Sequence, residues 1–154
     1  VVLLEAGRIV ATGGIHDVFT RLDLPPSHER DAAAIIEVIV ASHDDTYHLT
    51  TLDFAGGQIT VAQQPIKVGE EVRLRIAAPD VSITLEPQSS TSILNIFPAV
   101  VDEITEAGPA QVTVKLLAGG VPILSRVTRK SAVELGLETG KSVYAQVKTV
   151  ALLN

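Results

Sequence analysis

The sequence predicts an all-β protein, made of two small barrels in tandem with one or two short helices. From residue 34 onward, short β-branched runs alternate with Gly, Pro, Asp or Asn roughly every ten residues, which is typical of a small sandwich or barrel. With three Phe, two Tyr and no Trp, the core must consist mainly of Val, Ile, Leu and Ala. Segments 69–83 and 140–152 share one order of features: a Gly turn, an alternating strand and a short apolar run. This order is expected from a duplication, and equally from the turns and strands of any β protein.

Composition excludes several classes of function. Twelve Lys and Arg against 18 Asp and Glu give a net charge of -6, without the concentrated basic face that nucleic-acid binding requires. The absence of Cys excludes disulfides, thiolate metal sites and cysteine nucleophiles. No apolar run approaches the roughly 20 residues of a membrane-spanning helix, and no export signal is visible. The chain begins with an apolar run and no initiator Met, so we expect a segment of a longer protein.

The beginning of the chain predicts a hairpin and a helix. Two apolar runs, 1–4 and 9–11, flank Gly7 and predict the hairpin. Apolar residues then recur at helical spacing, with Asp17 early and Arg21 late as the helix dipole prefers, which predicts a short helix over residues 15–23. Pro25-Pro26 ends this helix, and the polar stretch that follows is the predicted linker, residues 25–33.

The remaining chain divides into two sets of strands at the polar break Gln88-Ser89-Ser90. In the first set, residues 34–88, we expect strands over 34–41, 47–53, 58–62, 71–77 and 81–85. In the second set, residues 89–154, we expect strands over 92–104, 111–117, 123–127 and 142–153. A short helix is predicted over 129–137 and ends at Gly136.

Two motifs invite a catalytic or metal-binding interpretation that we reject. Gly140-Lys141-Ser142 resembles the end of a phosphate-binding loop, but the first Gly of that motif is Leu135 here, and the predicted helix precedes it instead of following it. Residues 43–48, His-Asp-Asp-Thr-Tyr-His, hold enough ligand types for a transition metal, yet they join two strands as an exposed turn would. No nucleophile elbow or Ser/His/Asp arrangement is visible, so we expect neither catalytic residues nor a metal site.

Hydroxyl groups and one Lys are predicted at the ends of strands in the second set. Thr128 precedes the predicted helix, where a hydroxyl usually serves as an N-cap, and Lys148 interrupts an apolar stretch, where a solvated Lys is the ordinary interpretation. The alternative is a site for a small oxyanion, because hydroxyls, backbone N–H groups and an ammonium are all donors. The residues in question are Thr91, Ser92, Asn95, Thr128, Ser131, Lys148 and Thr149.

At these positions the chain resembles the ATP-binding subunits of molybdate ABC transporters, and more broadly the molybdate-binding barrels of storage proteins and repressors. Residues 91–95, Thr-Ser-Ile-Leu-Asn, resemble the opening motif of that barrel. Residues 126–137, Arg-Val-Thr-Arg-Lys-Ser-Ala-Val-Glu-Leu-Gly-Leu, resemble its Ile-Thr-x-x-Ser-x-x-x-Leu-Gly-Leu motif. Gly140-Lys141 and Val147-Lys148 resemble the Gly-Lys and terminal Ile-Lys pairs that follow in the family.

The resemblance extends upstream and implies a domain order. Residues 5–13 resemble the last hairpin of an ABC ATPase domain, and residues 75–82 resemble the OB-like (TOBE) module appended to such subunits. It therefore implies an ATPase remnant over 1–24, a linker over 25–33, an OB-like TOBE module over 34–88 and a Mop-type molybdate-binding module over 89–154. The nucleotide-binding motifs are not in this sequence, so the resemblance places ATP in a preceding domain and implies no enzymatic activity here.

By the same resemblance, this region would be regulatory, binding molybdate or tungstate and forming a homodimer. The intact subunit would join membrane permease subunits at the cytoplasmic face of the inner membrane, as a peripheral protein. Where the family often places Arg, this chain has Leu94, which favours the alternative of a structural dimerisation module without ligand sensing. The anion-binding residues that the resemblance implies are Ser92, Asn95, Thr128, Ser131, Lys148 and Thr149.

Overall fold

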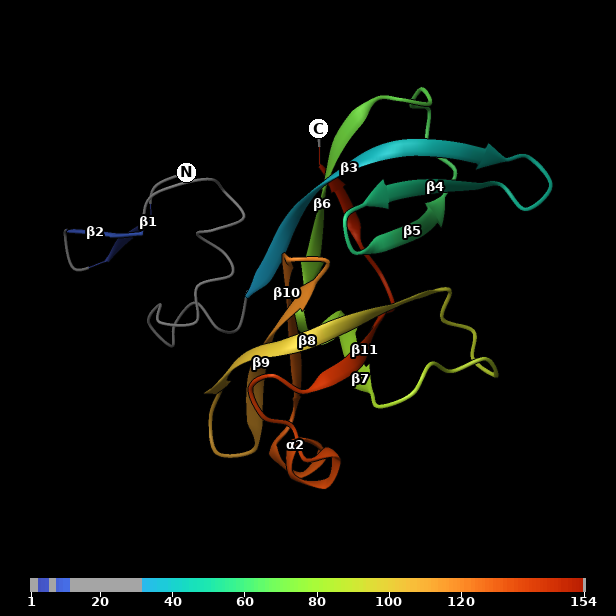
Figure 1. Cartoon of the computed structure of the whole chain (residues 1–154). Helices are drawn as coiled ribbons and strands as arrows, with labels where there is room; N and C mark the ends of the chain where they lie inside the picture. Colours follow the sequence, from blue (N-terminus) through green and yellow to red (C-terminus); the bar gives the residue numbers. More distant parts are fainter. Residues whose placement is uncertain (1–2, 6–7, 12–31, 154) are drawn as a thin grey trace.

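The computed structural model describes residues 3–5, 8–11 and 32–153 (Figure 1). Strands β1 (Leu3–Glu5) and β2 (Arg8–Ala11) pair in antiparallel fashion, which confirms the predicted hairpin pairing. The predicted helix over 15–23 lies outside the described residues, as does most of the predicted linker. No helix among the described residues is long and apolar enough to cross a membrane.

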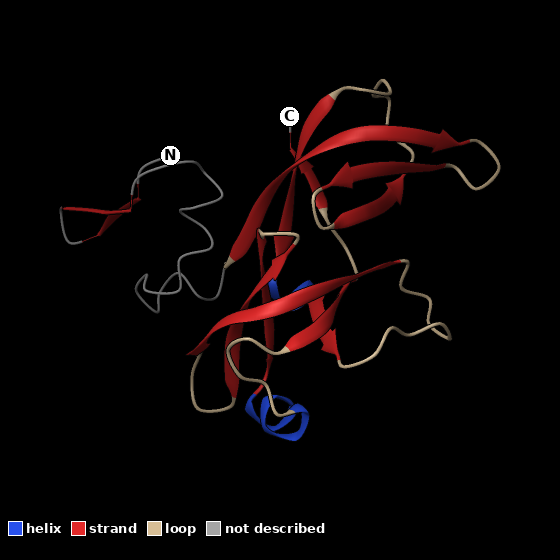
Figure 2. Cartoon of the chain, viewed as in Figure 1, coloured by secondary structure: helices blue, strands red, loops and turns tan. Residues whose placement is uncertain are grey.

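Residues 32–153 are almost entirely β structure, as predicted (Figure 2). Two short helical elements accompany the strands: the 3-10 helix η2 (Ala78–Asp80) and the α-helix α2 (Arg129–Leu135). The strands are β3 (Ala33–Asp44), β4 (Leu49–Phe54), β5 (Gly57–Ala62), β6 (Glu71–Ala77), β7 (Val81–Thr84), β8 (Asn95–Glu106), β9 (Gln111–Ala118), β10 (Val121–Thr128), β11 (Ser142–Val147) and β12 (Ala151–Leu153).

The strands form two five-stranded antiparallel sheets that exchange one strand each. The first sheet has the order β12-β6-β3-β4-β5 and the second the order β10-β9-β8-β11-β7. After β6 the chain crosses through η2 into the second sheet as β7, and after β11 it crosses back into the first sheet as β12. Each sheet is thus completed by a strand from beyond the boundary predicted at residues 88 and 89, so the two halves interlock.

The suspected internal repeat is present in the backbone. Gly69 and Gly140 precede β6 and β11 with φ of 91° and 92°. Their N–H groups donate to Val40 O and Val101 O at 2.7 and 2.8 Å, next to the irregularities in the long strands β3 and β8. Read as β3-β4-β5-β6-β7 and β8-β9-β10-β11-β12, the two sheets also have the same strand order, including the exchanged last strand. These matches favour the duplication.

One aliphatic core joins the two sheets. Its buried residues come from alternating positions of strands in both sheets, as half-buried antiparallel strands require. Phe54 and Phe97 meet across the sheets edge to face, with ring centroids 5.2 Å apart. The buried Ser125 hydroxyl on β10 donates to Val81 O on β7 at 2.6 Å, which links the two edge strands of the second sheet. A core of this kind makes the two sheets, β3 to β12, a single packing unit.

Two predicted boundaries were wrong, and a third was confirmed. The strand predicted over 92–104 begins only at Asn95, so Ser92 lies in the preceding loop. The strand predicted over 142–153 is two strands, because the exposed residues Lys148 and Thr149 leave the second sheet and Lys148 N–H donates to Asp80 O at 2.9 Å. The helix predicted within 129–137 is Arg129–Leu135, and Gly136 ends it as predicted, because it adopts the left-handed conformation.

Candidate functional site

Four of the six predicted ligand residues line one open pocket at the start of β8. The pocket has a volume of about 500 Å³ and lies between the loop before β8, the connection from β11 to β12, and β5. Its predicted members are Ser92, Asn95, Lys148 and Thr149. The other residues that line this pocket are Thr60, Thr91, Ile93 and Leu94. Thr60 could not be assigned from the sequence, because it reaches the pocket from the other sheet.

Lys148 supplies the positive charge of this pocket. Its backbone is fixed by the hydrogen bond to Asp80 O, while the side chain is exposed. Within residues 32–153 the Lys148 ammonium makes no hydrogen bond or ion pair. The hydroxyl of Ser92 is also without a partner among the described residues. Both donors are therefore available to a ligand, and neither has to break an internal contact first.

Asn95 forms the wall of the pocket by tying the two sheets together. Its side chain is 93% buried, as its exposed fraction is 7%. Asn95 Oδ1 accepts a hydrogen bond from Thr60 N–H at 2.7 Å, and Asn95 Nδ2 donates to Thr60 O at 3.0 Å. One Nδ2 hydrogen remains as a donor, because an amide carries two. Asn95 is thus first a structural link, and ligand contact through it stays a prediction.

Leu94 is an exposed apolar residue in this pocket. Its side chain is 68% exposed, beside Ser92 and Lys148 in the pocket lining. A hydrophobic side chain at this position offers an anion no hydrogen bond. The exposed position can, however, accommodate a longer side chain without disturbing the core.

Thr128 and Ser131, the other two predicted residues, lie elsewhere. Thr128 is the N-cap of α2, as the ordinary interpretation predicted: its hydroxyl accepts the Ser131 N–H at 3.0 Å. The two hydroxyl oxygens are hydrogen-bonded at 2.9 Å, and both side chains are at the surface. At the other end of α2, Lys141 Nζ donates to Leu135 O at 2.8 Å and to Gly136 O at 3.2 Å.

The structure thus divides the predicted anion site into two groups. Arg129, the first residue of α2, is ion-paired with Glu106 at the end of β8, with a distance of 3.0 Å between Nη2 and Oε1. Asn95 begins β8 and pairs with Val147, which is followed by Lys148. The length of β8 therefore separates the Thr128 and Ser131 pair from the pocket (Figure 1). The six predicted residues therefore do not meet within one chain, because α2 extends from the far end of β8.

The two rejected motifs have structural roles. Lys141 of the Gly-Lys-Ser segment caps the C-terminus of α2, and the helix precedes it, as predicted. In the turn after β3, the Asp44 carboxylate accepts the N–H groups of Thr46 and Tyr47 at 2.9 and 3.2 Å, which confirms the predicted turn. His43 is held by Thr50 and the Ile66 carbonyl. Among the described residues no group of three or more His, Cys, Asp or Glu side chains could hold a metal ion.

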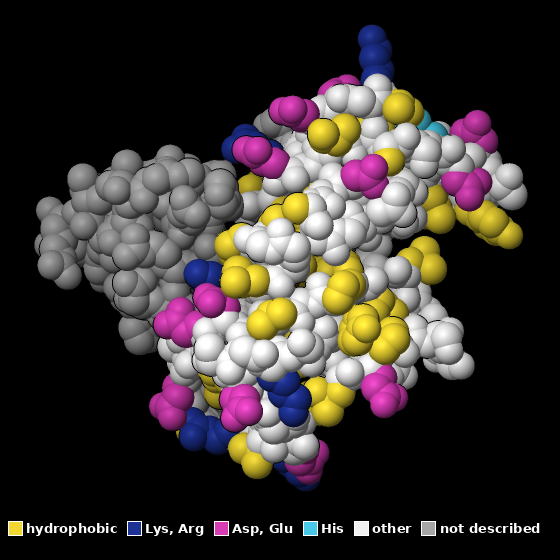
Figure 3. Space-filling model, in the orientation of Figure 1, with side chains coloured by type: hydrophobic (Ala, Val, Ile, Leu, Met, Phe, Trp, Pro, Cys, Tyr) yellow, Lys and Arg dark blue, Asp and Glu magenta, His cyan; other side chains and the backbone are white. Residues whose placement is uncertain are grey.

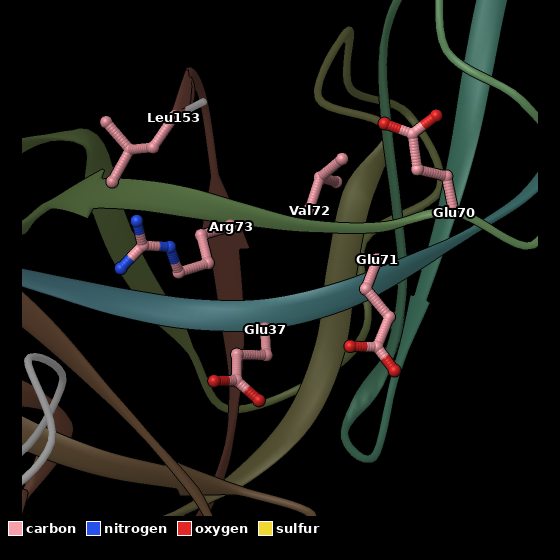
Figure 4. A pocket seen from close by; sticks show the side chains of 6 residues that line it. All are labelled: Glu37, Glu70, Glu71, Val72, Arg73 and Leu153. Atoms are coloured by element: carbon pink, nitrogen blue, oxygen red, sulfur yellow. The ribbon is translucent and has the colours of Figure 1, made fainter.

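A second open pocket, on the first sheet, has the wrong charge for an anion. It has a volume of about 450 Å³ and lies beside the paired strands β3, β6 and β12. Its lining holds three carboxylates, of Glu37, Glu70 and Glu71, and a single guanidinium, of Arg73 (Figure 4). An excess of carboxylates repels an oxyanion, so the pocket at the start of β8 remains the candidate site.

Comparison with known proteins finds a matching domain family and similarity to molybdenum import ATP-binding proteins. Residues 91–153 match the TOBE domain family. The chain is 47% identical over 154 residues to the molybdenum import ATP-binding protein ModC 1 of Azotobacter vinelandii. That alignment covers 99% of this chain and 43% of the relative. It is 49% identical over 152 residues to the molybdenum import ATP-binding protein ModC of Albidiferax ferrireducens, in an alignment that covers 99% of this chain and 41% of the relative. The chain therefore spans about two fifths of the length of these relatives.

A solved structure has the same fold. The cytoplasmic molybdate-binding protein ModG, in a crystal form with molybdate bound, superposes with a TM-score of 0.66 and 26% sequence identity. The match covers 77% of this chain and 93% of that one. The predicted resemblance to molybdate transporter subunits and the predicted all-β, TOBE-type fold are both confirmed.

Proposed function

We propose that this chain, which carries a TOBE domain and is similar throughout to the C-terminal region of molybdenum import ATP-binding proteins, binds molybdate or tungstate as a regulatory signal. One observation carries the proposal: the pocket at the start of β8 joins an unpartnered ammonium, Lys148, to hydroxyl donors on a fold shared with a molybdate-bound protein. In the whole transporter subunit, bound anion would favour one arrangement of two subunits and slow import. Regulation of this kind requires different affinity for the two arrangements.

The donors of this pocket suit a fully deprotonated tetrahedral dianion. Ser92, Thr149 and Lys148 can all donate, and no carboxylate lines the pocket. Phosphate near neutral pH keeps a proton that needs an acceptor, so it would bind less well than molybdate or tungstate. Sulfate has the same charge as molybdate and would be distinguished by its smaller size alone. The chain carries a net charge of -6, so attraction must come from these local donors.

We propose further that the complete anion site is shared by two subunits of a homodimer. Thr128, at the end of β10, and Ser131, in α2, lie beside the end of β8 that is opposite to the pocket, but the same hydroxyls of a second subunit could complete the pocket. The intact protein would carry its ATPase domain before this region. It would act with permease subunits at the cytoplasmic face of the inner membrane, as the ModC relatives suggest.

Replacing Leu94 by Arg tests the anion site directly. The added guanidinium would enter the pocket beside Lys148 and make charge-assisted hydrogen bonds, so we expect about tenfold tighter molybdate binding. Calorimetric titration with molybdate, tungstate and sulfate measures this change. If the original chain and Leu94→Arg both remain folded and give flat titrations, the alternative function follows: a structural dimerisation module that senses no ligand.

The 154-residue chain itself should not bind or hydrolyse ATP. Lys141, the only Lys in a Gly-Lys-Ser segment, is engaged in capping α2, and a strand follows it where a phosphate-binding loop requires a helix. Phosphate release with magnesium and ATP should equal the buffer background. A magnesium-dependent rate that disappears in Lys141→Ala would contradict this expectation.

A further inference from the structure

Two polar groups buried on the second sheet have no partner. Within the part of the chain that the structure describes, the Nε and Nη2 atoms of Arg126 and the hydroxyl of Thr113, a residue only 1% exposed, make no hydrogen bond. The two residues are directly opposite each other in β10 and β9, so their side chains share one face of the sheet. This face points away from the core, because Val114 and Ile123, at alternating positions, lie in the core. The guanidinium therefore lacks the acceptor that a buried charged donor requires.

Other cations of these strands and of α2 are matched within the chain. Lys115, on the same face of β9, lies 3.6 Å from the Asp102 carboxylate. Arg129, at the start of α2, is ion-paired with Glu106. Arg126 differs from both, because no carboxylate of the described residues is hydrogen-bonded to its buried nitrogens. Its acceptor has to come from another part of the protein or from a partner.

An apolar hollow of about 320 Å³ lies at the start of the same strand. Its lining includes Ile35 and Ile36 of β3 and Val121 and Pro122 of β10. Pro122 points to the same side as Arg126, because the two positions are four residues apart in one strand. Figure 3 shows hydrophobic side chains at the surface in the part of the molecule where β3 begins. The outer side of β10 thus combines a hollow for an apolar side chain with a cation.

The polypeptide enters the two sheets beside this surface. Ala32 O accepts the Ala78 N–H at 3.0 Å, and η2, which begins at Ala78, contacts β10. Strand β3 begins at Ala33 and also contacts β10 (Figure 1). A domain that precedes Ala32 in the same polypeptide is therefore tethered close to β10. Tethering gives it a high effective concentration at this surface, so even a small contact can hold it there.

We propose that the ATPase domain of the intact subunit docks on the outer side of β10, with an apolar side chain in the hollow and a carboxylate on Arg126. The inference rests on the proposed function, in which that domain precedes this region. More than half of the length of the relatives lies outside their alignment with this chain, which leaves room for such a domain. A carboxylate matches a guanidinium with two parallel hydrogen bonds. The contact would join the anion-binding region directly to the domain that it regulates.

Hydrogen exchange on the intact subunit tests the docking. Strand β10 is at the edge of its sheet, with β9 on one side only, so its outward N–H groups exchange readily unless another part of the protein covers them. We expect the amides of residues 121–128 to exchange at least several-fold more slowly in the intact subunit than in the 154-residue chain. Equal exchange in the two proteins would overturn the docking. Exchange that slows with the concentration of the 154-residue chain alone would assign the surface to a second copy, and would overturn it too.

Arg126→Leu should act differently in the two proteins. In the 154-residue chain it removes donors that have no partner, so the melting temperature should stay the same or rise, which also shows that the variant folds. In the intact subunit it removes the partner of a carboxylate, so residues 121–128 should exchange as fast as in the 154-residue chain. Lys67→Leu, in the exposed loop between β5 and β6, is the matched control and should leave this exchange unchanged. A lower melting temperature of the 154-residue Arg126→Leu chain would show that Arg126 is satisfied within it, against the proposal.

Molybdate calorimetry on the intact subunit separates the docking from the proposed function. If β10 is protected in the intact subunit and no molybdate binds, the docking stands and the proposed function fails. If molybdate binds and β10 exchanges equally in both proteins, the proposed function stands and the docking fails.

Discussion

Lys148→Ala should weaken molybdate binding at least tenfold and leave the fold intact. The ammonium is the only positive charge in the pocket lining, and charge-assisted hydrogen bonds contribute about 1.5 to 3 kcal/mol. The fold should not respond, because this side chain is exposed and makes no hydrogen bond or ion pair with the described residues, while the backbone bond to Asp80 O persists. Calorimetry gives the affinity, and urea unfolding of the same sample gives the stability.

Two control variants separate a specific contact from the general loss of positive charge. Lys67→Ala removes the same charge from an exposed loop outside the pocket lining and should leave affinity within about twofold, because salt screens distant surface charges. Lys148→Arg keeps the charge and should retain most of the affinity. Equal losses in Lys67→Ala and Lys148→Ala would contradict a specific anion contact at Lys148.

A mixing experiment uses the Lys148 variant to test the sharing of the site. Ser131→Ala alone should also weaken binding, although less than loss of a charge. If each site combines Lys148 of one subunit with Ser131 of the other, a mixed dimer of the two variants regains one intact site. Random mixing in equal amounts should then restore about a quarter of the high-affinity capacity, as two-fold symmetry requires. No recovery, with dimers present, would contradict a shared site.

The sequence predicted individual strands better than their assembly. Strand β6 has the predicted bounds, because Val72, Leu74 and Ile76 alternate with charged residues between a Gly turn and a Pro. The cap at Thr128 and the stop at Gly136 were also recognised, since both depend on local chemistry. Such features are set by residues a few positions apart, which a single sequence displays directly.

The exchange of strands and the division of the site depend on contacts between distant residues. Nothing local indicates that β12 leaves β11 to pair with β6, although the polar pair Lys148-Thr149 within an apolar stretch marks the crossing. Thr60 lines the pocket because the Asn95 side chain holds its backbone N–H and carbonyl across the two sheets. The predicted ligand residues were chosen by motif, and a motif carries no information on which end of a barrel each residue occupies.

The turns after β4 and β9 bring the backbones of the two sheets close together. A Cβ added at Gly56 would lie 2.6 Å from Ala118 O, and one added at Gly119 would meet the carbonyl oxygen of Ala55 and come within 2.8 Å of Gly56 Cα. Gly119 also has φ of 58°, a conformation that favours glycine. Neither obstacle is the end of a flexible side chain, so only backbone movement could relieve the clash.

Gly119→Ala should therefore lower the free energy of unfolding by more than about 2 kcal/mol, since it adds a backbone clash to left-handed strain. For a chain of this size, that loss corresponds to a fall in melting temperature of roughly 4 to 8 °C. Gly120→Ala is the matched control in the same turn: φ is 84°, but an added Cβ meets nothing within 4 Å, so only the strain of about 1 kcal/mol remains. Urea unfolding measures both. Equal destabilisation by the two variants would show that the two turns can move apart, and that the sheets do not depend on this contact for their packing.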